Sequence, residues 1–143
     1  MVDITRKVVT LRTAVAQAIV KVGSPDTIKA IEDKTVPKGD VFEMSKAAGL
    51  LGVKKTAELL PDCHPLPIEY TGISYEVKGL EIHIRITVKT HYKTGVEVEA
   101  MHGASLVALN LYDMLKPIDK HVEIFHIKLL QKTGGKSDIH REG

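Results

Sequence analysis

An aspartate and a lysine stand three residues apart near the carboxyl end of the chain, where Asp113 and Lys116 close a long apolar segment. On a helix this spacing places the two side chains on one face. A carboxylate beside an ammonium group can transfer protons to and from a bound ligand. The alternative is an ordinary surface ion pair. Because an acid near a helix C-terminus faces the negative end of the helix dipole, we expect a raised pKa for Asp113.

A glycine turn with two lysines follows, in residues 132–137 (KTGGKS). It is not a phosphate-binding loop, since the first glycine of that motif is replaced by Leu130 and only a seven-residue, mostly polar tail follows Lys136 where the motif needs a helix. We expect a flexible turn that presents Lys132 and Lys136 in the same neighbourhood as Asp113. The alternative is a solvated tail.

Two further polar segments lie at the ends of other elements. Cys63 and His64, in residues 62–66 (DCHPL), follow a helix that Pro61 must end. The chain has one cysteine and no paired-histidine motif, so we expect no metal site. His64 could bond a ligand or simply hold its loop. Glu97 and Glu99 either stabilise a helix start or bind a guanidine-like edge of a ligand.

Composition narrows the class of protein. The 143 residues suffice for one domain with a real core, and the net charge of +2 is too balanced to indicate nucleic-acid or membrane binding. The absence of Trp argues against stacking platforms for single-stranded nucleic acid. One cysteine, no signal-peptide pattern and no apolar run long enough for a membrane span lead us to expect a cytoplasmic protein.

The periodicity of apolar residues predicts the elements that position these segments. The clearest is residues 80–89, where Leu80, Ile82, Ile84, Ile86 and Val88 fall on one face of a strand. We predict further strands at residues 8–22, 68–77 and 122–130, helices at 24–34, 40–52, 53–60 and 98–116, a break at Gly52, a loop at 35–39 and a frayed tail at 137–143. Residues 8–22 could also form a helix, although a strand is favoured.

This order matches a split βαβ pattern once the two middle helical pieces are merged into one crossover. We therefore predict a single domain, residues 1–143, of the ferredoxin-like α+β class. Its antiparallel sheet would carry the helices on one face.

Five segments together resemble the cyclic pyranopterin monophosphate synthase family (MoaC), which acts in molybdenum cofactor biosynthesis. They are residues 37–41 (PKGDV), 63–66 (CHPL), 94–100 (TGVEVEA), 111–114 (LYDM) and 132–137 (KTGGKS). They occur in the family's order over nearly the whole chain. Asp62, Val98 and Leu115 depart from its pattern, and Asp62 adds a charge that could alter ligand affinity.

The resemblance implies a lyase that converts 3′,8-cyclo-7,8-dihydroguanosine 5′-triphosphate to cyclic pyranopterin monophosphate and releases diphosphate. It implies Asp113, Lys116 and Lys38 as catalytic residues. The implied substrate-binding residues are Asp62, Cys63, His64, Glu97, Val98, Glu99 and Lys132.

The resemblance also implies a homohexamer, a trimer of dimers with sites at dimer interfaces. We expect no tightly bound cofactor, although magnesium could accompany the triphosphate, and no nucleic-acid or membrane partner. Two other functions remain open on this fold: a regulatory module that binds a nucleotide without turnover, and an RNA-binding domain. The aromatic-rich motif of the latter is absent from the candidate strands.

Overall fold

The computed structural model describes all residues, 1–143, with helices and strands in alternating groups. The elements are β1 (Thr10–Lys21), α1 (Pro25–Glu32), α2 (Val41–Lys54), α3 (Thr56–Leu59), β2 (Tyr70–Lys78), β3 (Glu81–Tyr92), α4 (Glu97–Leu115), β4 (Glu123–Thr133) and β5 (Ile139–His140). None of the helices combines the length and apolarity that crossing a bilayer requires.

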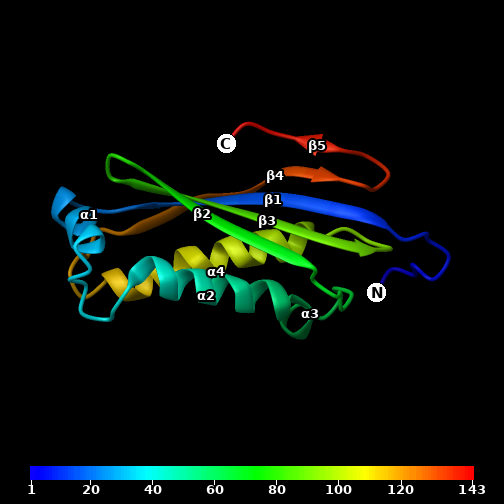
Figure 1. Cartoon of the computed structure of the whole chain (residues 1–143), viewed down its shortest axis with the longest axis horizontal. Helices are drawn as coiled ribbons and strands as arrows, with labels where there is room; N and C mark the ends of the chain where they lie inside the picture. Colours follow the sequence, from blue (N-terminus) through cyan, green and yellow to red (C-terminus); the bar gives the residue numbers. More distant parts are fainter.

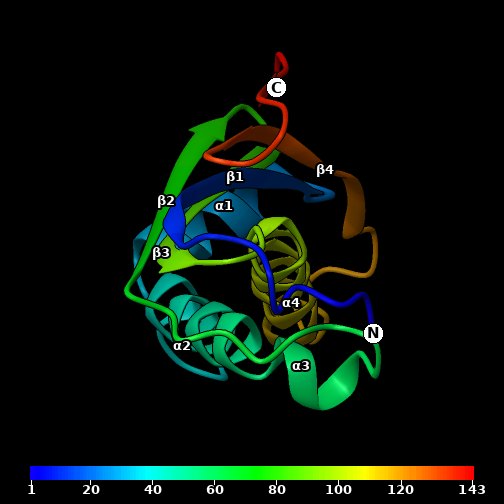
Figure 2. The ribbon, with the colours of Figure 1, turned by 90° about the vertical axis from the view of Figure 1, so that its right-hand side faces the viewer.

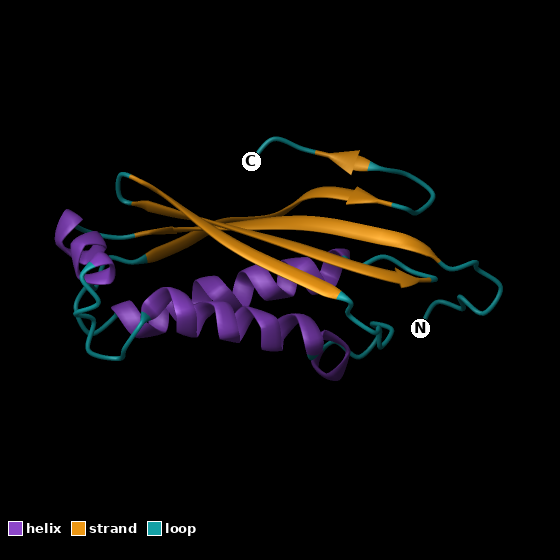
Figure 3. Ribbon diagram, in the orientation of Figure 1, coloured by secondary structure: helices purple, strands orange, loops and turns teal.

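The strands form one antiparallel sheet in the spatial order β2-β3-β1-β4-β5. The helices lie on one face of it, with α2 and α4 side by side under the strands and α1 at one end (Figures 1 and 3). Strands β1 to β4 with their two helical crossovers have the ferredoxin-like order. The predicted α+β class is therefore confirmed.

The core lies between the sheet and α4 and is almost entirely aliphatic. The inward face of β3 is buried as its alternation predicts, from Ile82 to Val88. Three alanines of β1, at positions 14, 16 and 18, are fully buried and leave room for α4 to approach the sheet. From α4 the buried side chains include Ala104, Val107, Leu111 and Met114.

Helices α2 and α4 approach most closely at two glycines. A Cβ atom on Gly49 would lie 2.5 Å from Val107 Cγ2 and 3.5 Å from the Gly103 carbonyl oxygen. A Cβ on Gly103 would lie 2.6 Å from Val53 Cγ2 and 3.4 Å from the Gly49 carbonyl oxygen. The two backbones therefore touch at a point where no larger residue fits.

The predicted starts of the first two helices are confirmed, but the predicted break at Gly52 and the helix start after it are misplaced. The side chain of Ser24 accepts from the Asp26 amide, and that of Asp40 from the Glu43 amide. Helix α2 runs through Gly52, which packs against Leu106 of α4, and ends at Lys54. Gly52 is thus a close-packing glycine inside a helix rather than a helix breaker.

The prediction of a flexible glycine turn with a frayed tail is wrong. Gly134 has φ = 97° and lies against β1, where a Cβ would clash with the Leu11 carbonyl group. The Thr10 hydroxyl donates to the Gly134 carbonyl at 2.7 Å. Beyond the turn, β5 pairs with Gln131 and Lys132, so the turn is held on both sides.

Candidate active site

Lys38, Asp113 and Lys116 form a compact group at the C-terminal end of α4, here called the lysine–aspartate cluster. Lys38 Nζ lies 3.2 Å from Asp113 Oδ2, and Lys116 Nζ lies 3.2 Å from Asp113 Oδ1. All three side chains are partly exposed, so a ligand can reach them. One carboxylate between two ammonium groups provides both a proton acceptor and proton donors.

The position of Lys38 depends on a tight turn between α1 and α2. Val36, which begins the turn, is buried, and its carbonyl accepts from the Gly39 amide at 3.1 Å. Gly39 has φ = 116°, a conformation that favours glycine. The turn thereby directs Lys38 toward the last turn of α4, 75 residues later in the sequence.

The expected rise in the pKa of Asp113 is contradicted. Hydrogen bonds from Lys116 and Lys38 lower the pKa of Asp113 below its ordinary value, and the charges of the same lysines act in the same direction. Two adjacent cations outweigh the unfavourable end of the helix dipole. Asp113 is therefore a carboxylate at neutral pH and suits a proton acceptor.

A second group of predicted residues surrounds a pocket of about 240 Å³ at the first turn of α4, here called the carboxylate pocket. The loop after α3, the first turn of α4 and the N-terminal segment form its walls. Its lining residues are Val2, Ile4, Lys7, Asp62, Cys63, His64, Leu66, Thr94, Gly95, Glu97, Val98 and Glu99.

Glu97 and Glu99 point in different directions because α4 begins at Glu97. Glu97 faces the glycine turn, where Lys132 Nζ lies 3.9 Å from its Oε1. Glu99 is only 3% exposed, and the Cys63 thiol donates to its carboxylate at 3.6 Å. Burial raises the pKa of Glu99. Burial, followed by the charge of Glu99, also raises the pKa of Cys63, which favours the protonated thiol.

The remaining predicted residues of the pocket touch the N-terminal segment or solvent. His64 Nε2 donates to the Val2 carbonyl at 2.8 Å. The Asp62 carboxylate lies 2.9 Å from the Met1 amino group, and its side chain is otherwise exposed. Val98 is partly exposed and contributes an apolar patch to the pocket wall.

The structure does not bring the two groups together within one chain. Asp113 follows Glu97 by sixteen residues of continuous helix, which corresponds to about 24 Å along its axis. Figure 1 shows the C-terminal end of α4 near α1, and its N-terminal end near α3 and the end of the sheet where the chain starts. The expected single neighbourhood of Asp113 and Lys132 is therefore split into two half-sites at opposite ends of α4.

A groove of about 450 Å³ runs along the outer side of α4 between the half-sites. Leu106, Leu109 and Tyr112 of α4 and Ala48 of α2 line it, and it opens beside the lysine–aspartate cluster. Leu109 is 56% exposed and Tyr112 is 40% exposed. This apolar face has no cover within the chain.

Arg12 lies between the glycine turn and the loop before α4, a position that the sequence did not reveal. Its Nη2 donates to the Lys93 carbonyl at 3.2 Å, its Nη1 lies close to Gly135, and its Nε is buried without a partner. The guanidinium therefore joins the glycine turn to the loop before α4. A single arginine in a strand with alternating burial is indistinguishable from a solvent-facing residue, so no signal in the sequence identified it.

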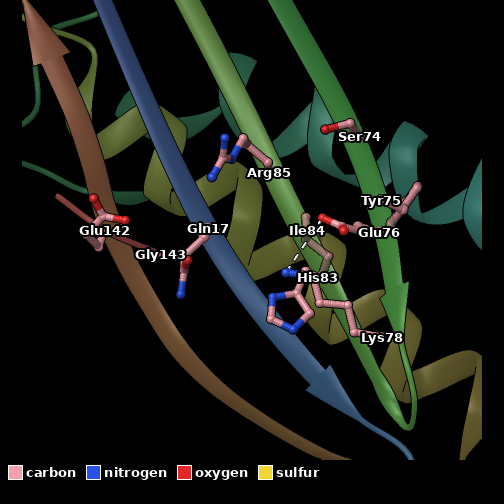
Figure 4. Close-up of a pocket in the computed structure, with 10 residues that line it drawn as sticks. All are labelled: Gln17, Ser74, Tyr75, Glu76, Lys78, His83, Ile84, Arg85, Glu142 and Gly143. Atoms are coloured by element: carbon pink, nitrogen blue, oxygen red, sulfur yellow. Dashed lines mark ion pairs between the residues drawn. The ribbon is translucent and has the colours of Figure 1, made fainter. Parts of the chain in front are cut away.

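A larger hollow, of about 620 Å³, lies on the opposite face of the sheet over β1, β2 and β3 (Figure 4). Gln17, His83 and Arg85 line it, together with an ion pair between Lys78 and Glu76 at 3.8 Å. None of the predicted site residues faces it. The predicted catalytic and binding residues all lie in the half-sites on the helix side, although the cavities there are smaller. The chain contains no group of three or more His, Cys, Asp or Glu side chains placed to hold a metal ion.

Comparisons with known proteins identify the family of this chain. The family model described as MoaC family matches residues 1–135. Cyclic pyranopterin monophosphate synthase of Pelobacter propionicus is 47% identical over 143 residues, 99% of this chain and 89% of its own. The Geotalea uraniireducens protein of that name is 45% identical with the same coverage. The one of Aquifex aeolicus is 42% identical over 98% of this chain, which spans 55% of that longer relative. The chain therefore belongs to the MoaC family.

Proposed function

We propose that the chain is a cyclic pyranopterin monophosphate synthase of molybdenum cofactor biosynthesis. It would convert 3′,8-cyclo-7,8-dihydroguanosine 5′-triphosphate to cyclic pyranopterin monophosphate and release diphosphate. The observation that carries this proposal is the lysine–aspartate cluster, in which Asp113 lies 3.2 Å from both Lys38 and Lys116.

The cluster supplies what the reaction requires of the protein. Opening a purine-derived ring and closing it again as a pterin needs several proton transfers. The Asp113 carboxylate can accept a proton, while the ammonium groups of Lys38 and Lys116 can donate one or hold a phosphate oxygen by charge. Closing a cyclic phosphate with loss of diphosphate also develops negative charge, which nearby cations stabilise.

We further propose that each working site combines the half-sites of two copies of the chain. The reacting ring must touch proton-transfer groups and binding groups at once, and about 24 Å of helix separates these in one chain. A two-fold axis that sets two α4 helices antiparallel would place the N-terminal end of one beside the C-terminal end of the other.

The uncovered groove between α2 and α4 supports this arrangement. Its apolar residues extend from Leu106, near the middle of α4, to Tyr112 beside the lysine–aspartate cluster, so a two-fold axis near Leu106 would bring this face against its own copy. Exposed Met44 and Leu51 extend the apolar face along α2. Such a surface is suited to pair with its own copy. The expected homohexamer, a trimer of dimers, would repeat this pair three times.

Magnesium in this scheme enters with the phosphates of the substrate rather than on protein ligands. Mg²⁺ keeps several waters and commonly binds through substrate phosphates. Chelation with EDTA should then change the affinity for the triphosphate without affecting the folded protein. The one cysteine is compatible with a reducing compartment, and we propose the cytoplasm as the location.

The decisive experiment is incubation of the purified protein with the cyclised guanosine triphosphate. We expect diphosphate and a pterin that carries a cyclic phosphate in equal amounts. Binding of the compound without either product would instead favour the regulatory module that binds a nucleotide. Absence of both binding and products would reject the proposed substrate.

A further inference from the structure

The N-terminal segment covers the carboxylate pocket but is anchored weakly. Among residues 1–9 only Ile4 is partly buried, and all the others are exposed. Ile4 and Val2 line the pocket together with Glu97 and Glu99. Figure 2 shows the segment leaving the sheet, passing the first turn of α4 and ending near α3.

Residues 3–7 hold their own shape through local hydrogen bonds. The Asp3 carboxylate accepts from the Thr5 amide at 2.9 Å and from the Thr5 hydroxyl at 2.8 Å. The Lys7 amide donates to the Ile4 carbonyl at 3.1 Å. These contacts form a turn that can move as one unit.

Three polar contacts attach the N-terminal segment to the rest of the chain, and an extended stretch joins it to β1. His64 Nε2 donates to the Val2 carbonyl at 2.8 Å, Lys93 Nζ donates to the Thr5 carbonyl at 3.4 Å, and the exposed Asp62 carboxylate lies 2.9 Å from the Met1 amino group. Val8 and Val9 precede β1 and are 75% and 57% exposed. Few buried contacts and exposed hydrogen bonds are typical of segments that open locally at low cost.

The pocket under this segment suits a flat ring that has hydrogen-bond donors along one edge. Ile4, Val2, Leu66 and Val98 give it an apolar side. Glu99 is buried, and its carboxylate has more acceptor positions than the single weak donor Cys63 fills. A carboxylate can accept two N–H groups from an amidine-like edge in parallel.

We propose that residues 2–7 form a lid that closes on the face of a 2-aminopyrimidinone-type ring while Glu99 accepts from its donor edge. The lid opens about Val8 and Val9 to admit the ring and closes through Ile4 and the Val2–His64 contact. Ile4 is thus a positioning residue. This inference rests on the proposed function, because the guanosine-derived substrate carries such an edge.

Binding of GTP, which has the same ring edge, tests the lid separately from turnover. Hydrogen exchange of the Thr5 and Lys7 amides should slow when GTP binds, and ITP, which lacks the 2-amino group, should bind more weakly and protect them less. Ile4→Gly should weaken GTP binding about tenfold, the scale expected for losing one buried aliphatic side chain. Val77→Gly is the control and should stay within about twofold, since Val77 is an exposed aliphatic residue of β2 that lies outside the carboxylate pocket.

Three results would contradict the proposed lid. GTP could speed the exchange of these amides, Ile4→Gly could bind GTP more tightly, or the two glycine variants could weaken binding equally. The first two would mean that the segment competes with the ligand, and the third that the loss of binding is not specific to the segment. If the cyclised triphosphate is not turned over but GTP still protects the lid, the proposed function fails and the lid stands.

Discussion

Lys38 contacts Asp113 through two different groups of the aspartate. Its ammonium lies 3.2 Å from the Asp113 carboxylate and also donates to the Asp113 backbone carbonyl at 2.9 Å. The lysine therefore closes the end of α4 as well as neutralising the side chain. This double contact fixes the Asp113 carboxylate relative to the turn before α2, in the absence of any ligand.

Asp113→Asn should lower turnover by at least about a hundredfold while leaving the fold intact, because the amide keeps the shape but cannot accept a proton. Release of diphosphate measures turnover, and thermal unfolding measures stability. Asp33→Asn is the matched control: Asp33 is also 51% exposed and lies 3.2 Å from a lysine, but at the end of α1. Activity within tenfold of the parent would exclude Asp113 as an essential proton acceptor.

Mixing two inactive variants tests whether sites are shared between chains. Asp113→Asn and Glu99→Gln alter opposite ends of α4, so a mixed dimer would contain one intact site and one doubly altered site. Random mixing should restore about one quarter of the parent activity. Mixing Asp113→Asn with Lys38→Ala should restore none, because these side chains meet within one chain. A fully active monomer in sedimentation would contradict shared sites.

Lys132→Ala should reduce affinity for the triphosphate more than Lys136→Ala does. Lys132 is held in the strand β4 and faces Glu97 at 3.9 Å, whereas Lys136 is exposed on the turn. A positioned ammonium that contacts a phosphate should change the Michaelis constant by about tenfold, and turnover as well if the contact strengthens in the transition state. Both variants are compared at one salt concentration. A larger effect of Lys136→Ala would place the phosphate on the outer part of the turn.

Asp119 should contribute to the unfolding free energy in a pH-dependent way. Burial raises the pKa of Asp119, but hydrogen bonds from the Thr27 hydroxyl and the Gly23 and His121 amides outweigh it, so the pKa is lowered. Its stabilising effect is then present above about pH 4 and lost as the pH falls through the folded-state value. Asp119→Asn should lower the unfolding free energy by about 1–3 kcal/mol at pH 7 and by less at pH 3.

Urea unfolding at the two pH values measures this difference. Asp26→Asn, an exposed change on α1, serves as the control and should cost only about a few tenths of a kcal/mol. An equal loss at pH 7 and pH 3 for Asp119→Asn would mean that shape rather than charge matters at this position.

Glu99→Gln should make Cys63 more reactive. Burial and the neighbouring Glu99 charge raise the pKa of Cys63, and removal of that charge should increase the thiolate fraction. The rate of alkylation by iodoacetamide at pH 8 should therefore rise. Glu97→Gln should have a smaller effect, because Glu97 contributes less to the pKa of Cys63. A slower reaction of the Glu99→Gln variant would show that Glu99 instead exposes the thiol.

The strands and the starts of helices were predictable because their signals are local. Strict alternation from Leu80 to Val88 identifies a half-buried strand, and Ser24 and Asp40 cap helices through their own side chains. The break predicted at Gly52 was wrong because this position requires a glycine for packing against another helix, where Leu106 of α4 leaves no room for a side chain. The glycine turn was misread for the same reason, since β1 holds it.

The sequence indicated which residues could belong to the site, but not how they are arranged in space. Asp113 and Lys116 are helix neighbours by spacing, whereas the approach of Lys38 depends on a turn far away in the sequence. Hydrogen bonds from Lys116 and then Lys38 reverse the expected direction of the Asp113 pKa shift. The split into half-sites follows from the unbroken length of α4, which motif spacing does not reveal.

The contact between Gly49 and Gly103 ties the chemistry of Asp113 to a point ten residues away along α4, about 15 Å. Lys38 lies just before α2, and Asp113 lies in the last turn of α4. The distance between the two side chains therefore depends on how closely the two helices pack where they cross. A single methyl group added at either glycine would spread the helices and transmit the displacement to both ends. Substitutions of Gly49 or Gly103 should therefore disturb the lysine–aspartate cluster, although neither glycine belongs to it.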